Sequence, residues 1–212
     1  MHIIHRGIIN KKFKENNLNS FKASFKKKFG IETDIHATKD GEFICHHDFT
    51  LKRIFNINKS IKKINYKTLR EIVKNKNDIP LLDDVLKSSK NKYRLFIEIK
   101  PIFNKSLLVK LINKTTKFKN CVFISFNEKN IFNLLKLKKN ISVGLSFSYK
   151  TNIKNILNGS SNKRVEYLIL DKKFLNNKKI EKIKKKKYFY TIKNKRDFIR
   201  YSKKNNLIFE NL

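Results

Sequence analysis

One short segment, Glu32–Asp48, concentrates side chains that could do chemistry. It reads ETDIHATKDGEFICHHD, and its first two carboxylates, Glu32 and Asp34, are two residues apart. On a strand this spacing puts both on one face, where they need a proton or a cation between them. A solvated hairpin with scattered charges is the simpler explanation for an isolated acidic pair. The scarcity of acids argues against it, since the chain has 17 acidic residues and 51 basic ones.

The dipeptide Asp40-Gly41 predicts a two-residue hairpin turn inside this segment, because a type I′ turn requires positive φ. In that register Asp34 lies opposite His47. The hairpin would therefore bring Glu32, Asp34 and His47 to one face at its open end. A divalent cation with a histidine beside it is one arrangement that satisfies such a cluster.

The elements that must position these residues alternate between strand and helix signals, which is typical of parallel βαβ units. The eight predicted strands indicate a minimal (β/α)₈ TIM barrel, a single domain over residues 1–212, with the hairpin as an excursion after the second strand. The strands are predicted at 2–7, 31–37, 93–100, 121–127, 141–147, 166–171, 188–194 and 207–211, and the helices at 18–29, 106–118, 128–139, 175–186 and 195–205.

In such a barrel the carboxyl ends of the strands line the active site. His5 and Arg6 end the first predicted strand, and Glu98 and Lys100 end the third. Taken singly, His5 is a satisfied core histidine and Glu98 is a partner for Lys100. Taken together, one mouth would gather three carboxylates, two histidines, an arginine and a lysine: Glu32, Asp34, Glu98, His5, His47, Arg6 and Lys100.

The formal net charge of +34 suggests nucleic acid as a partner. However, arginine supplies only 7 of the 51 cations, and lysines occur in every segment rather than in one stripe. We therefore expect no specific nucleic-acid partner. No apolar run approaches the roughly 20 residues of a membrane span, no signal peptide is evident, and two cysteines are too few for a disulfide framework. The expected location is the cytoplasm.

The order of short motifs along the chain resembles the glycerophosphodiester phosphodiesterase family. The resemblance runs in order from residue 1 to about 127 and continues more loosely to the end. The matching motifs are HRG (5–7), EN (15–16), ETD (32–34), TKDG (38–41), HD (47–48), LKR (51–53), IPLLDDVL (79–86), EIK (98–100) and SFN (125–127).

The resemblance implies a (β/α)₈ barrel that hydrolyses glycerophosphodiesters to sn-glycerol 3-phosphate and an alcohol with a divalent cation. It implies Glu32, Asp34 and Glu98 as metal ligands, and all-oxygen ligation suits Mg²⁺ or Ca²⁺. It also implies His5 and His47 as the acid/base pair. The remaining expected site residues bind or orient substrate: Arg6 and Lys100 hold the phosphate, Glu15 orients Arg6 or a histidine, and Tyr190 stands where the family often has a tryptophan.

Two departures from the family pattern shape the expectations. The closing strand reads Ile208-Phe209-Glu210-Asn211 where the family has a motif like ITD-x-P, and we expect no eighth outer helix. A homodimer would cover the flank that such a helix leaves open. Two alternative functions stay open: a lysophospholipase D acting on lipids that retain one acyl chain, and a non-catalytic basic barrel that binds anions or nucleic acid. The head group and the nucleophile, water or the substrate's own hydroxyl, are also open.

Overall fold

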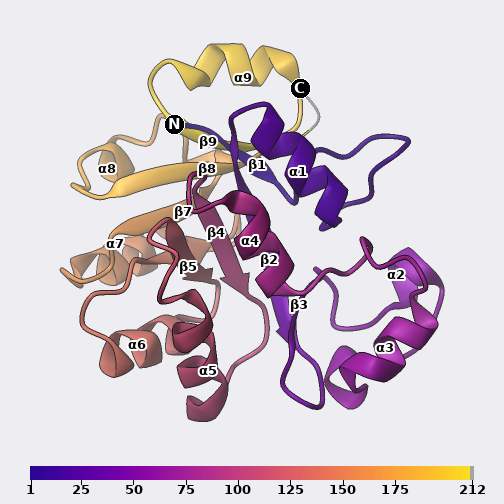
Figure 1. Cartoon of the computed structure of the whole chain (residues 1–212). Helices are drawn as coiled ribbons and strands as arrows, with labels where there is room; N and C mark the ends of the chain where they lie inside the picture. Colours follow the sequence, from indigo (N-terminus) through magenta and orange to yellow (C-terminus); the bar gives the residue numbers. More distant parts are fainter. Residues whose placement is uncertain (211–212) are drawn as a thin grey trace.

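The computed structural model describes residues 1–210, and its strands form one nine-stranded sheet (Figure 1). Eight strands are parallel and close on themselves, because β1 pairs with both β2 and β9. This closure confirms the predicted (β/α)₈ barrel, and every predicted barrel strand is present. The barrel strands are β1 (Ile3–His5), β2 (Gly30–Ala37), β4 (Leu95–Ile99), β5 (Cys121–Ser125), β6 (Val143–Phe147), β7 (Tyr167–Asp171), β8 (Lys186–Ile192) and β9 (Asn206–Phe209).

The barrel interior is filled by side chains, so it is a packed core. One cluster inside it contains three aromatic rings, Phe96, Tyr167 and Tyr188, together with aliphatic residues such as Ile3 and Ile208. Alternate residues of the same strands point outward and pack beneath the helices in a larger cluster. This core supports the strand ends from below and fixes their positions.

Six of the outer helices start in the same way. The helices are α1 (Leu18–Lys26), α5 (Lys105–Thr115), α6 (Glu128–Leu137), α7 (Ile153–Ser161), α8 (Lys178–Glu181) and α9 (Lys195–Ser202). Each follows an asparagine whose side chain accepts a hydrogen bond from a backbone N–H of the first turn. Asparagine is among the best N-cap residues because its side-chain oxygen satisfies a donor that has no partner inside the helix.

The predicted helices differ from the structure in three places. No helix was predicted between residues 37 and 93, where the structure has α2 (Lys52–Phe55), α3 (Tyr66–Ile72) and α4 (Leu82–Ser89). Helix α7 was not predicted, although Asn152 caps it, because its last residues, Asn158 to Ser161, are weak helix formers. The helix predicted at 175–186 is reduced to one turn, α8. The lysine-rich residues after it lead into β8, where the ammonium groups of Lys185 and Lys187 donate to the backbone carbonyls of Val165 and Ile183, both at 2.6 Å.

Strand β2 continues past the barrel and pairs antiparallel with β3 (Phe43–Cys45). The segment that follows contains α2 (Lys52–Phe55), the 3₁₀ turn η1 (Ile61–Lys63), α3 (Tyr66–Ile72) and α4 (Leu82–Ser89). It has its own apolar cluster, which includes Ile44, Leu51 and Leu69. Figure 1 shows α2 and α3 to one side of the barrel, while α4 returns to lie along α1.

The predicted hairpin register was wrong by one residue. Ala37 pairs with Phe43, and the backbone N–H of His46, not of His47, donates to Asp34. The loop is longer than two residues because the Thr38 hydroxyl accepts from the Glu42 N–H and donates to the Asp40 carboxylate, while Gly41 takes the positive φ of 76°. Strand β3 ends at Cys45, so a turn and not strand alternation places His47.

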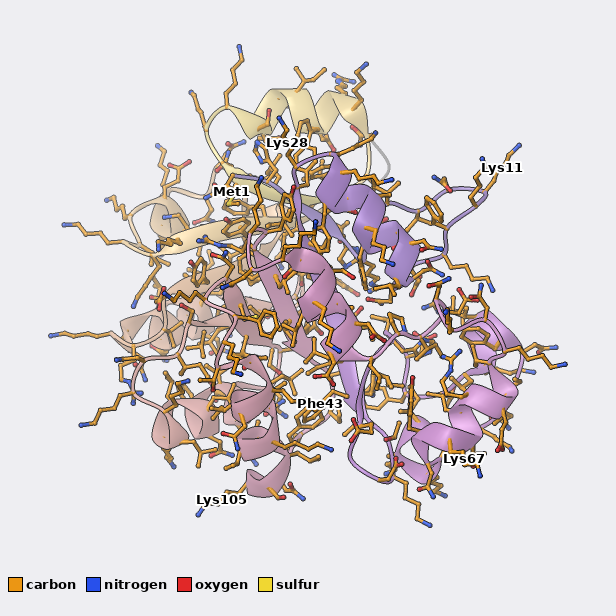
Figure 2. The ribbon with its side chains drawn as sticks, viewed as in Figure 1. Met1, Lys11, Lys28, Phe43, Lys67 and Lys105 are labelled. Atoms are coloured by element: carbon orange, nitrogen blue, oxygen red, sulfur yellow. The ribbon has the colours of Figure 1, made fainter. Side chains whose placement is uncertain are left out.

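The basic side chains lie all around the molecule. Figure 2 shows nitrogen-tipped side chains projecting on many sides, as at Lys11, Lys67 and Lys105. No helix within residues 1–210 is long and apolar enough to cross a membrane. The description stops one residue after β9, so the expectation of no eighth outer helix falls outside the described residues, as does Asn211 of the predicted last strand.

Candidate active site

Three carboxylates form the centre of the site. Asp34 of β2 lies directly beside Glu98 of the neighbouring strand β4. Glu32 lies two residues before Asp34, on the same face of β2. One oxygen from each of the three lies within 4.8 Å of the others, and all three residues are buried. Burial, together with the charges of Asp34 and Glu98, raises the pKa of Glu32 well above its usual range. Burial likewise raises the pKa of Glu98 to about 7. Three such carboxylates repel one another unless a cation joins them.

Arg6 and Lys100 supply part of the missing positive charge. Arg6 Nε lies 3.1 Å from Asp34 Oδ2, and Lys100 Nζ lies 2.8 Å from Glu98 Oε1 and 3.5 Å from Asp34 Oδ1. Burial alone would raise the pKa of Asp34, but the charges of Arg6 and Lys100 outweigh it and lower this pKa to about 2. Asp34 is therefore ionised at neutral pH, with both cations directed at it.

An unusual backbone turn directs Arg6 and Asn16 at Asp34. Both residues have positive φ, 54° and 52°, and the Asn16 N–H donates to the Arg6 carbonyl at 2.9 Å. The Asn16 side chain donates to Asp34 Oδ2 at 3.1 Å and accepts from the Thr33 hydroxyl at 2.8 Å. Non-glycine residues take this conformation at a cost, which is lower for asparagine, and the contacts of both side chains with Asp34 help to hold it here. Asn16 was not among the predicted site residues, although its motif had been noted.

His5 lies at the end of β1, in register with Glu32. Its Nε2 is 3.6 Å from Glu32 Oε2, and its Nδ1 is 2.5 Å from Glu210 Oε1. Glu210 directly follows β9, the neighbour of β1 in the closed barrel. The hydrogen bond from His5 lowers the pKa of Glu210, so this carboxylate is ionised. The sequence had shown Glu210 only as a departure from the closing-strand motif, so its contact with His5 was missed.

His47 also has a carboxylate on its Nδ1, which lies 2.6 Å from Asp48 Oδ1. Arg53 of α2 donates to Asp48 Oδ2 through Nε and to Glu15 through its terminal nitrogens. Glu15 in turn accepts from Arg6 at 3.2 Å. Alternating charges thus connect the two sides of the mouth. Burial lowers the pKa of His47, and the nearby charge of Asp34 offsets this only in part, so His47 is neutral at pH 7.

Tyr190, near the end of β8, lies at the same end of the barrel in register with Asp171. Its hydroxyl donates to the Phe147 carbonyl at 3.1 Å, and its ring meets Phe126 edge-on at 5.9 Å. The hydroxyl is thereby engaged by the backbone.

The site fits a divalent cation. Both carboxylate oxygens of Glu32 are buried without a hydrogen-bond partner, which is costly unless another ligand uses them. Every candidate ligand atom is a carboxylate oxygen, the type that Mg²⁺ and Ca²⁺ prefer. Among residues 1–210 these three form the one acidic or histidine-containing group close enough to hold an ion.

Comparisons with known proteins identify the family and the fold of the chain. A sequence model of the glycerophosphoryl diester phosphodiesterase family matches residues 5–209. A comparison with curated sequences finds no match.

Solved structures with the same fold cover nearly the whole chain. A glycerophosphodiester phosphodiesterase from Thermotoga maritima is 22% identical, with 98% of this chain and 92% of that one covered and a TM-score of 0.82. A phosphodiesterase from Oleispira antarctica, in complex with the product sn-glycerol-3-phosphate, is 19% identical, with 99% and 92% covered and a TM-score of 0.83. These likenesses establish the fold, and the family match establishes kinship. The chain belongs to the glycerophosphoryl diester phosphodiesterase family of phosphoric diester hydrolases.

Proposed function

We propose that the protein hydrolyses glycerophosphodiesters to sn-glycerol 3-phosphate and an alcohol, with a divalent cation, Mg²⁺ or Ca²⁺. The observation that carries this proposal is a buried carboxylate triad between two histidines, each of which has a second carboxylate on Nδ1. The Oleispira relative supports the choice of product, since its structure holds sn-glycerol-3-phosphate.

Glu32, Asp34 and Glu98 would hold the cation. When bound, it would neutralise the non-bridging phosphate oxygens as negative charge builds on them. Arg6 and Lys100, which both contact Asp34, would donate to the same phosphate.

His47 and His5 would share the proton transfers. The carboxylate on each Nδ1 would hold a proton there, which leaves Nε2 of each ring for the reaction. Neutral His47 takes a proton from the attacking hydroxyl, of water or of the substrate's glycerol, whose oxygen bonds to phosphorus. The bond from phosphorus to the alcohol oxygen breaks, and that oxygen takes the Nε2 proton of His5, which enters the step as the imidazolium with both ring nitrogens protonated. Where the glycerol hydroxyl attacks, this step gives a cyclic phosphodiester, which water then opens with the two histidines in exchanged roles. Asp48 and Glu210 stabilise each imidazolium while it exists.

Metal removal tests the proposal. We expect the purified protein to release glycerol 3-phosphate from glycerophosphocholine, to stop in EDTA, and to recover when Mg²⁺ or Ca²⁺ is added back in excess. The product is measured by coupled oxidation of glycerol 3-phosphate. Full release in EDTA, or no release from choline, ethanolamine, glycerol and inositol diesters with either metal, would contradict the proposal.

Glu210 is expected to act through His5 as a positioning residue. Glu210→Gln keeps the shape but removes the carboxylate that fixes the ring, so we expect kcat to fall about 10- to 100-fold while KM changes little. Glu166→Gln is the matched control, because Glu166 precedes β7 at the opposite end of the barrel and bonds to Ser142. An equal loss in both variants, or a rise in KM without a fall in kcat, would contradict this role.

A further inference from the structure

Large apolar side chains are exposed along one arc of the barrel mouth. Phe49, Ile102, Phe126 and Tyr149 are 56%, 58%, 46% and 59% exposed, and we call these four residues the mouth rim. They follow β3, β4, β5 and β6, which belong to one continuous part of the sheet, in the order β6-β5-β4-β2-β3. The other exposed large apolar residues among 1–210 lie at the N-terminus or on outer helices: Met1, Val109, Leu157 and Ile199.

The mouth rim is not explained by packing. Ile102 and Tyr149 belong to none of the apolar clusters of the described residues. Phe49 meets the ring of His36 edge-on, and Phe126 meets Tyr190 edge-on with the ammonium of Lys100 5.9 Å from its ring centre, so both remain about half exposed. Exposed apolar area of this kind is unfavourable in water, and its collection around a functional opening indicates a contact surface.

Cations lie beside these side chains. The ammonium of Lys150 is 5.7 Å from the centre of the Tyr149 ring, and Lys172 and Lys173 are exposed on the next segment, after β7. The nearby acids are few. Asp48 is bound by Arg53, Asp171 caps the backbone of Lys173, and Glu128 is exposed at the start of α6. The surface that surrounds the mouth is thus both apolar and positively charged.

We propose that the mouth rim docks the barrel mouth onto an anionic phospholipid surface. Tyrosine and lysine side chains sit well at the head-group level, where the ring is half-buried and the ammonium meets lipid phosphates, while isoleucine and phenylalanine enter the acyl boundary. Single-stranded nucleic acid fits less well, because it calls for successive aromatic rings along a groove and arginine beside them, whereas Ile102 offers no ring. Docking needs no turnover, so this inference is independent of the proposed reaction.

Two double variants separate the mouth rim from general basicity. Ile102→Ser with Tyr149→Ser removes two rim side chains that touch no proposed catalytic residue. Val109→Ser with Leu157→Ser is the control, because it removes two exposed apolar residues from the outer helices α5 and α7. Each protein is sedimented with vesicles of phosphatidylglycerol and phosphatidylcholine in roughly equal amounts. Measurements are made at low salt and at about 0.5 M NaCl, where attraction between exposed charges is screened. Equal melting temperatures of the variants check folding.

At high salt we expect the rim variant to bind vesicles at least about tenfold more weakly than the wild type and the control, because apolar insertion is not screened. The chain has no tryptophan, so Tyr149→Trp gives a single fluorophore that brominated acyl chains should quench. Equal binding of the rim variant and the wild type, an equal loss in the control, or no quenching would overturn the proposal. A matching loss of single-stranded RNA binding in the rim variant would also overturn it and assign the rim to nucleic acid.

Discussion

His5→Ala is expected to lower kcat for glycerophosphocholine about 100- to 10,000-fold, the usual contribution of one general acid or base. His5 Nε2 faces Glu32, and its Nδ1 is held by Glu210, so the ring is fixed with Nε2 toward the carboxylate triad. If His5 protonates the leaving alcohol, an alcohol that needs no proton should restore the rate. We therefore expect His5→Ala to retain most of its activity on glycerophospho-p-nitrophenol, whereas His47→Ala loses activity on both substrates.

His2→Ala is the matched control for His5→Ala. His2 lies just before the same strand but at the opposite end, where its Nδ1 accepts from the Leu207 N–H. We expect its activity to stay within about threefold of the wild type, since its contact is structural. Full activity of His5→Ala on the choline substrate would show that His5 is not needed for catalysis. If His5→Ala loses activity equally on the two substrates, His5 would act as the base and His47 as the acid.

The barrel was predictable because each strand is a short apolar run between polar segments. Eight such runs that alternate with helices are compatible with few folds other than a barrel. The same reasoning grouped Glu32, Asp34, Glu98 and Lys100, because parallel strands end at one edge. Helix α7 was not predicted because the apolar periodicity is weak in a segment that ends in glycine and serine. The capping asparagine before it, Asn152, nevertheless indicates the start of a helix.

Contacts between distant segments could not be predicted from the sequence. Glu210 reaches His5 only because the barrel closes β9 against β1, and Arg53 reaches Glu15 only because the segment after β3 brings α2 next to the segment after β1. The hairpin register depended on a side-chain choice, the Thr38 hydroxyl bonding within its own loop, which a turn rule based on Asp-Gly does not include.

Glu32→Gln is expected to stabilise the protein without metal and destabilise it with metal. The two oxygens of the Glu32 carboxylate have no hydrogen-bond partner, and burial, together with the charges of Asp34 and Glu98, raises its pKa. A glutamine has nearly the same shape, carries no charge and can donate to Asp34 or Glu98. We expect a gain of about 1 kcal/mol in EDTA, which is about 2–4 °C in Tm for a chain of this size.

The same substitution should abolish stabilisation by metal. A ligand at 100 times its Kd stabilises a native protein by about 2.7 kcal/mol, which corresponds to roughly 5–10 °C here. The wild type should show such a shift with Mg²⁺ or Ca²⁺, and Glu32→Gln should show little, so that the order of the two Tm values reverses between EDTA and metal. Glu42→Gln is the control, since Glu42 pairs with Lys110 on the hairpin loop away from the triad, and it should change Tm equally in both conditions. A lower Tm for Glu32→Gln in EDTA with an undiminished metal shift would mean that the Glu32 carboxylate serves the fold and not the ion. The reversal would show that the Glu32 carboxylate destabilises the metal-free protein and is needed to bind the cation.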